Sequence, residues 1–214
     1  MVHDTRVTTK KPKEHWENIY TTKQPTEVSW YKTHLDLSLE IISKLHLAPE
    51  SPLIDIGAGT STLVDDLLDQ KFKDISVLDI SAKALDISKK RLGHKADKVT
   101  WLESDITDAD LPKSHYELWH DRAVFHFLTD VRDRKKYVDV LRSSLKINGH
   151  LIIATFNLKG PLTCSGLDIV RYSPETLLKE LGSGFRLMEN VDEAHQTPSG
   201  VVQNFVYCWF RRSA

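Results

Sequence analysis

The sequence predicts an α/β fold built around a mostly parallel sheet. Short apolar runs alternate along the chain with segments whose apolar residues recur at helical spacing. This alternation is typical of parallel sheets, because a helix usually carries the chain back to the start of the next strand. Four of the apolar runs also end in an acid: Asp55, Asp79, Asp105 and Asp121. Since parallel strands end at a common edge, we expect these four acids to lie along it.

The turn after the first apolar run is the most informative stretch of the chain. Gly57 and Gly59 follow Leu53–Ile56 at alternate positions, and a helix is expected from Thr60 onward. Glycine allows a tight turn and lets a ligand lie almost against the backbone. A helix N-terminus adds free N–H groups. The turn therefore predicts a small-ligand site, although an isolated pattern of this kind also occurs in ordinary strand–helix turns.

The details of the turn narrow the choice of ligand. A dinucleotide fingerprint would place a third glycine where this chain has Thr62, and no Gly-Lys-Ser/Thr follows, which excludes a P-loop. Asp55 stands just before the first glycine, where it would face a cation better than a pyrophosphate.

The next two acids fit a nucleoside. Asp79, at the end of the second run, could accept hydrogen bonds from two ribose hydroxyls. Asp105 could accept a bond from an adenine amino group, with Ile80 and Ile106 as apolar walls for the ring. Any single acid could instead be a helix N-cap, but four in order make that explanation less favourable.

Together these motifs resemble those of the class I S-adenosylmethionine-dependent methyltransferases, from about Trp16 to the C-terminus. Asp55-x-Gly57-x-Gly59 matches the family's first motif, and Asp121 its fourth. The resemblance implies a Rossmann-like, three-layer α-β-α sandwich, with a mostly parallel seven-stranded sheet and an antiparallel C-terminal strand. It implies S-adenosyl-L-methionine as cofactor and S-adenosyl-L-homocysteine as product. The cofactor-binding residues expected from it are Asp55, Gly57, Gly59, Thr60, Asp79, Ile80, Asp105, Ile106, Asp121, Trp30 and Tyr20.

The expected organisation has three parts. Residues 1–14 form a disordered tail, residues 15–48 form N-terminal cap or lid helices, and residues 49–214 form the methyltransferase domain. Within these parts the sequence predicts helices over 15–20, 34–45, 60–69, 82–92 and 131–145, and another starting at Ser173-Pro174. It predicts strands over 150–156, after an Asn148-Gly149 turn, and over 185–193 and 201–210 as a closing hairpin.

The aromatic N-terminal segment allows two interpretations. Tyr20 and Trp30 could belong to a mobile lid over residues 15–31 that excludes water and faces the methylsulfonium cation. They could equally anchor a fixed cap to the sheet, which is the interpretation favoured for Trp16.

The segment after the fourth acid is expected to meet the methyl acceptor. Asp121 could contact the methionine amino group or the acceptor, and His126 could act as a base or orient the acceptor. His126 could alternatively be a buried histidine between Phe125 and Phe127. A metal site at His120 and His126 would lack a third ligand, so no metal is expected.

Composition limits the partners. The chain is 40% apolar with a formal net charge of −1, and it has no apolar run long enough to cross a membrane. Basic residues at 132–136 are interleaved with acids, and strand four lacks the Asn/Asp-Pro-Pro-Tyr/Phe motif, so nucleic acid is not favoured. Cys164 and Cys208 suggest no disulfide framework, and we expect a cytoplasmic protein. The acceptor could be a small-molecule thiol or amine, or a protein lysine. An inactive cofactor-binding sensor or scaffold is the alternative, and the oligomeric state is open.

Overall fold

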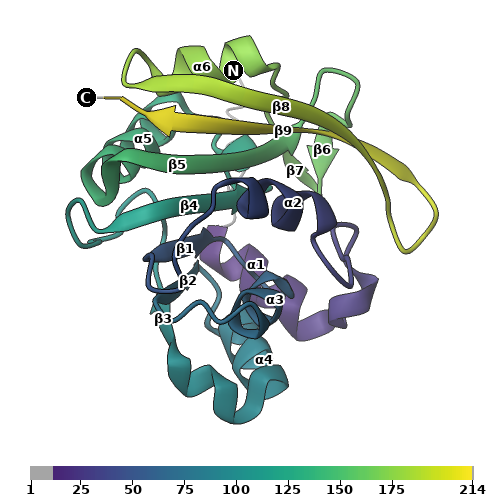
Figure 1. Ribbon diagram of the computed structural model, residues 1–214. Helices are drawn as coiled ribbons and strands as arrows, with labels where there is room; N and C mark the ends of the chain where they lie inside the picture. Colours follow the sequence, from purple (N-terminus) through teal and green to yellow (C-terminus); the bar gives the residue numbers. More distant parts are fainter. Residues whose placement is uncertain (1–11, 214) are drawn as a thin grey trace, which may run out of the picture.

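A seven-stranded sheet forms the centre of the computed structural model, which describes residues 12–213 (Figure 1). Its strand order is β3-β2-β1-β4-β5-β9-β8. Only β9 runs antiparallel to its neighbours, so the predicted fold class is confirmed. The strands are β1 (Leu53–Ile56), β2 (Ile75–Asp79), β3 (Val99–Glu103), β4 (Tyr116–Arg122), β5 (Leu145–Phe156), β8 (Phe185–Gln196) and β9 (Val202–Arg212). A separate two-stranded hairpin pairs β6 (Thr163–Cys164) with β7 (Leu167–Asp168).

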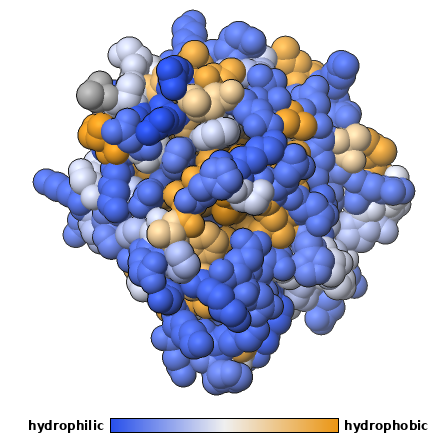
Figure 2. All heavy atoms as spheres, viewed as in Figure 1, coloured by the Kyte–Doolittle hydropathy of each residue, from blue (hydrophilic) through white to orange (hydrophobic). Residues whose placement is uncertain are grey.

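Helices cover both faces of the sheet and enclose two apolar cores. Side chains of α5 (Val131–Ser144) and α6 (Pro174–Leu181) build one core. Those of α2 (Asp36–Lys44), α3 (Leu63–Asp69) and α4 (Ala82–Leu92) build the other. Three short 3₁₀ segments, η1 (Pro25–Glu27), η2 (Gly93–Lys98) and η3 (Phe125–Phe127), complete the connections. Figure 2 shows that the face in view is mostly hydrophilic, with apolar side chains visible near its centre.

Several predicted boundaries are confirmed by their capping contacts. The hydroxyl of Ser81 accepts a hydrogen bond from the Ala84 N–H at the start of α4, and Gly93 ends that helix with φ +58°. Ser173 caps α6, with Pro174 at its first position. The closing hairpin, β8 and β9, is joined through residues 197–201.

The predicted starts of α3 and β5 are wrong. The helix expected from Thr60 starts only at Leu63, because the chain first completes the glycine turn through Thr62. The Asn148-Gly149 turn does not precede a strand but lies inside β5, which already begins at Leu145. Asn148 takes the left-handed φ of +65° that such an irregularity needs.

The N-terminal helix α1 spans Pro12–Thr22, longer at both ends than the predicted 15–20. Residues 12–14, assigned to the tail, are therefore helical, while residues 1–11 lie outside the described residues.

Strand register decides which acids share a face of the sheet. Asp55 lies opposite His120 of β4 and Val77 of β2, whereas Asp121 lies opposite Ile56. Neighbouring residues of a strand point to opposite faces. The side chains of Asp55 and Asp79 consequently share one face, and Asp121 points to the other.

Candidate cofactor and acceptor site

The glycine turn adopts the conformation that the sequence predicts. Gly57 and Gly59 have φ values of +57° and +56°, a region that other residues rarely adopt. A Cβ atom at Gly57 would overlap Cγ2 of Val124, and one at Gly59 would overlap the Tyr20 hydroxyl. The turn is therefore closely covered, and glycine is required for space as well as for backbone geometry.

Asp55 is held in a buried hydrogen-bonded chain. Its Oδ1 lies 2.7 Å from Nδ1 of His120, and the other ring nitrogen of His120 lies 2.9 Å from the Ser38 hydroxyl on α2. All three side chains are buried. The second carboxylate oxygen of Asp55 is buried and has no hydrogen-bond partner among the described residues. Such an oxygen needs a donor, which a cationic ligand group at the glycine turn would supply.

Asp79 connects the glycine turn to the start of α4. Its two oxygens accept hydrogen bonds from the N–H groups of Gly59, at 2.7 Å, and Ser81, at 2.8 Å. Each oxygen retains a lone pair for a further donor. Burial raises the pKa of Asp79 to about 6, and the two backbone hydrogen bonds oppose this shift.

The residues predicted to hold a nucleoside lie at the ends of β2 and β3. Asp105, in the turn after β3, uses Oδ1 to accept bonds from the N–H and hydroxyl of Thr107. Ile106 is buried and Ile80 is partly buried, as apolar walls of a ring site would be.

Aromatic side chains of the N-terminal segment pack together beside the glycine turn, where the Tyr20 hydroxyl covers Gly59. The ring of Trp16 lies 5.0 Å from that of Phe127 and 5.8 Å from that of Trp30, and Tyr20 packs on Trp30 at 6.4 Å. These four residues are called the aromatic cluster below. Burial raises the pKa of Tyr20 well above its usual value, so its phenol stays protonated.

Polar contacts fix both ends of this N-terminal segment. The carboxylate of Glu17 accepts bonds from the N–H groups of Ala82, at 2.7 Å, and Lys83, at 3.3 Å, which are free donors at the start of α4. Further along, the Arg122 guanidinium donates to the Trp30 carbonyl at 2.9 Å. The N-terminal segment is thus hydrogen-bonded to α4 near one end and to β4 near the other.

The geometry of Asp121 does not fit the predicted contact with an acceptor. Its side chain is fully buried beneath α5. It accepts bonds from the N–H groups of Val124 (2.9 Å) and Phe125 (3.2 Å) and from the Tyr137 hydroxyl (2.7 Å). Burial raises its pKa to about 6. These contacts fix the turn after β4 and join it to α5.

His126 is the buried histidine that the sequence offered as an alternative. It is fully buried and stacks on Phe156, with ring centroids 4.7 Å apart. Burial lowers its pKa to about 3, with Arg122 adding to the effect. Neither ring nitrogen has a hydrogen-bond partner among the described residues. From this position the neutral ring cannot touch an acceptor.

The sequence patterns missed Glu17, Ser38, the anchoring role of Arg122 and the contact of His120 with Asp55. Glu17 carries no signal, because its partners are backbone groups distant in sequence. His120 lies beside Asp55 through the register of β1 and β4, which local sequence signals do not determine.

The described residues contain no group of three or more His, Cys, Asp or Glu side chains arranged to hold a metal ion. No helix among them is both long and apolar enough to span a membrane.

Similarity to known proteins was found at the level of both sequence and fold. Residues 54–151 match a family model described as a methyltransferase domain. A solved S-adenosylmethionine-dependent methyltransferase from Anabaena variabilis superposes with a TM-score of 0.71 at 16% identity, covering 94% of this chain and 93% of its own. The 1,6-didemethyltoxoflavin-N1-methyltransferase of Burkholderia thailandensis superposes with a TM-score of 0.67 at 14% identity, covering 92% of this chain and 82% of its own. Residues 54–151 thus carry a methyltransferase domain, and the fold of the chain is that of the solved S-adenosylmethionine-dependent methyltransferases.

Two curated relatives are named as lysine methyltransferases. The mouse eEF1A lysine and N-terminal methyltransferase is 29% identical over 118 residues, which are 55% of this chain and 17% of the relative. The human EEF1A lysine methyltransferase 2 is 22% identical over 197 residues, or 84% of this chain and 76% of that protein. The chain thus spans only about a sixth of the mouse relative but most of the human one.

Proposed function

We propose that the protein transfers a methyl group from S-adenosylmethionine to a lysine side chain of a protein. The observation that carries the cofactor half is the buried, unpartnered oxygen of Asp55 beside the glycine turn. The acceptor half is supported by the relatives that are named protein lysine methyltransferases.

The residues present fit the cofactor. Asp55 Oδ2 would receive the ammonium group of its methionine part, which satisfies a carboxylate oxygen otherwise left buried and unpaired. Asp79 would accept the ribose hydroxyls with its remaining lone pairs, and Asp105 would accept the adenine amino group between Ile80 and Ile106. Gly57, Gly59 and Thr60 would line the methionine part along the turn.

The bound sulfonium supplies a methyl group that is already activated for attack by a nucleophile. The chain therefore has to position the lysine nitrogen in line and keep water away. The aromatic cluster serves both needs, because ring faces attract cationic groups and exclude solvent. Asp121 and His126 are buried and would contribute by stabilising the turn after β4.

The N-terminal segment combines both sequence interpretations. We propose that α1 opens to admit the cofactor, because the Tyr20 hydroxyl lies directly over Gly59. The stretch Val28–Tyr31 is the fixed part. Val28 is buried, and the carbonyls of Ser29 and Trp30 accept bonds from His195 and Arg122.

A labelling experiment tests the proposal. Cell extract is incubated with the protein and methyl-labelled S-adenosylmethionine, and labelled products are separated into proteins and small molecules. We expect label on proteins, recovered as N-methyl-lysine after hydrolysis, and a strong loss of label with the Asp79→Ala variant. Label confined to small molecules would contradict a protein acceptor. Cofactor binding without any transfer would identify an inactive sensor or scaffold.

A further inference from the structure

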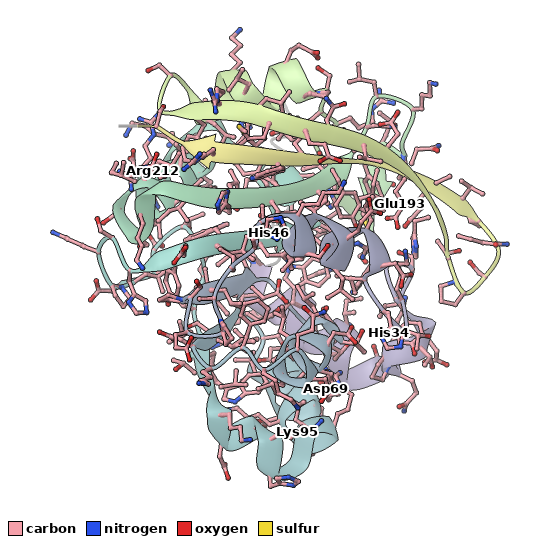
Figure 3. The ribbon with its side chains drawn as sticks, in the orientation of Figure 1. His34, His46, Asp69, Lys95, Glu193 and Arg212 are labelled. Carbon is pink, nitrogen blue, oxygen red and sulfur yellow. The ribbon has the colours of Figure 1, made fainter. Side chains whose placement is uncertain are left out.

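A cleft of about 620 Å³ opens between the N-terminal segment and the end of β8. Tyr31–His34 and Asp36 form one wall, and Ala194, His195, Gln196 and Pro198 form the other. Figure 3 labels His34 on the first wall and Glu193, the residue before Ala194, on β8. Among the described residues β8 pairs only with β9, so it is the edge strand of the sheet. The cleft therefore runs along an edge strand.

The backbone of Ala194 faces this free edge. Ala194 lies opposite Asn204 of β9, and the Asn204 carbonyl accepts a hydrogen bond from Asn157 on the β5 side. Opposite residues in an antiparallel pair either exchange both backbone bonds or point away from each other. Because Asn204 points toward β5, the N–H and C=O of Ala194 point away from β9. An edge of this kind is a template for another extended chain.

The two walls are held at a fixed separation. The Nε2–H of His195 donates to the Ser29 carbonyl at 2.7 Å, and Lys32 pairs with Glu193 at 2.6 Å. The neighbouring residue, Trp30, belongs to the aromatic cluster, while Tyr31 lines the cleft. Because Trp30 and Tyr31 are consecutive residues, the cleft adjoins the aromatic cluster.

The charges around the cleft favour a basic occupant. Lys32 is paired with Glu193 at 2.6 Å, whereas the Asp36 side chain is 80% exposed and lies 4.0 Å from the Lys32 ammonium group through one contact. Asp192, also exposed on β8, contacts the uncharged Asn157 amide at 3.2 Å. In the described part of the chain, Asp36 of the cleft wall thus has one distant cation, and Asp192, two residues before Ala194, has an uncharged amide as its contact.

We propose that this cleft binds an extended, lysine-bearing segment of the acceptor protein, which adds to the edge of β8 as a further strand. Main-chain pairing at Ala194 would hold the segment, and Asp36 and Asp192 would attract its basic side chains. The proposal rests on the proposed protein-lysine methylation and adds the site at which the acceptor docks.

An array of synthetic lysine-containing peptides, methylated with labelled S-adenosylmethionine, tests the proposal. Ala194→Pro removes the free-edge N–H but no bond to β9, whereas the matched control Ala194→Val keeps that N–H. We expect Ala194→Pro to lower kcat/KM for the best peptide by about three- to tenfold, mainly through KM, the range for one net hydrogen bond. Ala194→Val should stay near the wild-type value.

A charge reversal provides a second test that does not disturb the backbone. Asp192→Lys should weaken methylation of peptides with several basic residues more than that of peptides with a single lysine. S-adenosylhomocysteine binding, measured by calorimetry, should be unchanged in all three variants.

The outcomes separate the two proposals. Peptide methylation that is equal in the wild type, Ala194→Pro and Asp192→Lys would overturn the docking cleft and leave the methyltransferase proposal intact. Cofactor binding without labelling of any peptide or extract protein would overturn both.

Discussion

The β1–β2 half and the β4 half of the sheet edge look alike in sequence but differ in what their acids do. Each strand ends in a buried aspartate. Asp55 has one oxygen without a hydrogen-bond partner among the described residues, and each Asp79 oxygen accepts one protein hydrogen bond, from the glycine turn or from the start of α4. Asp121, on the opposite face, is satisfied by three protein donors. The same pattern thus forms a structural clamp in the β4 half, whereas the β1–β2 half is the part for which we propose a ligand site.

Titration behaviour does not separate the two kinds of acid. Burial raises the pKa of both Asp79 and Asp121 to about 6. What differs is the set of donors and the face of the sheet, so a shifted pKa alone would have marked the wrong residue as catalytic. The following predictions test this difference.

The largest effect is expected for Gly57→Val. The new side chain meets Val124 and also forces a branched residue into a positive φ, so we expect a loss of several kcal/mol, on the order of 4 kcal/mol. Gly93→Val is the matched control, because its φ is also positive, at +58°, but nothing lies within 4 Å. Urea unfolding should show a much smaller loss for the control, and equal losses would mean that the turn is not closely covered.

Asp121→Asn should destabilise the fold by about 3 kcal/mol, because the amide places donors against groups that already donate. The comparison is with Asp55→Asn, which keeps an oxygen for His120 and replaces the unpartnered one. The Asp55→Asn variant should lose less than half as much stability as the Asp121→Asn variant. Denaturant midpoints for both variants provide the measurement, and the reverse order would contradict the assignment of clamp and ligand site.

His126→Phe should remove a pH dependence of stability. The folded pKa of about 3 lies below the unfolded value of about 6.5, so the unfolded chain gains a proton first as the pH falls. The stabilisation is complete above the unfolded value and is lost toward the folded one, reaching about 2 kcal/mol of loss at pH 5.

The effect is read as a difference between the two proteins. Asp79 and Asp121, whose pKa values are raised, shift stability the opposite way between about pH 6 and 4, but they are common to both proteins and cancel. A stability difference between wild type and His126→Phe that stays constant from pH 7 to pH 5 would show that the pKa of the ring is the same in the folded and unfolded states.

The smallest effect concerns the N-terminal segment. Backbone hydrogen exchange over α1 should slow by about an order of magnitude or more when S-adenosylhomocysteine is added, because the helix then closes on a ligand. Exchange at residues 28–31 should hardly change, since Arg122 and His195 already hold them. Equal protection of both stretches with and without ligand would show a fixed cap throughout.

Much of this architecture could be predicted from local signals. Ser81, Gly93, Ser173 and Pro174 mark helix ends because capping is local chemistry, and Gly57 and Gly59 reveal the turn because few residues adopt its backbone angles. Register was not predictable, since the relative alignment of β1 and β4 depends on contacts across the sheet. That alignment places Asp121 away from Asp55 and brings His120 to it. The contacts of Glu17 with the start of α4 are likewise tertiary.

The central claim is that the cofactor binds on the face shared by Asp55 and Asp79. Calorimetric titration of S-adenosylmethionine into wild type, Asp79→Ala and Asp121→Asn, at a temperature where all three are folded, tests it most directly. Asp79→Ala should weaken binding at least about tenfold, because two charge-assisted bonds to ribose are lost. Asp121→Asn should bind within about twofold of wild type, and NAD should show no comparable binding to any of them. Binding that is lost in Asp121→Asn but kept in Asp79→Ala would contradict the account.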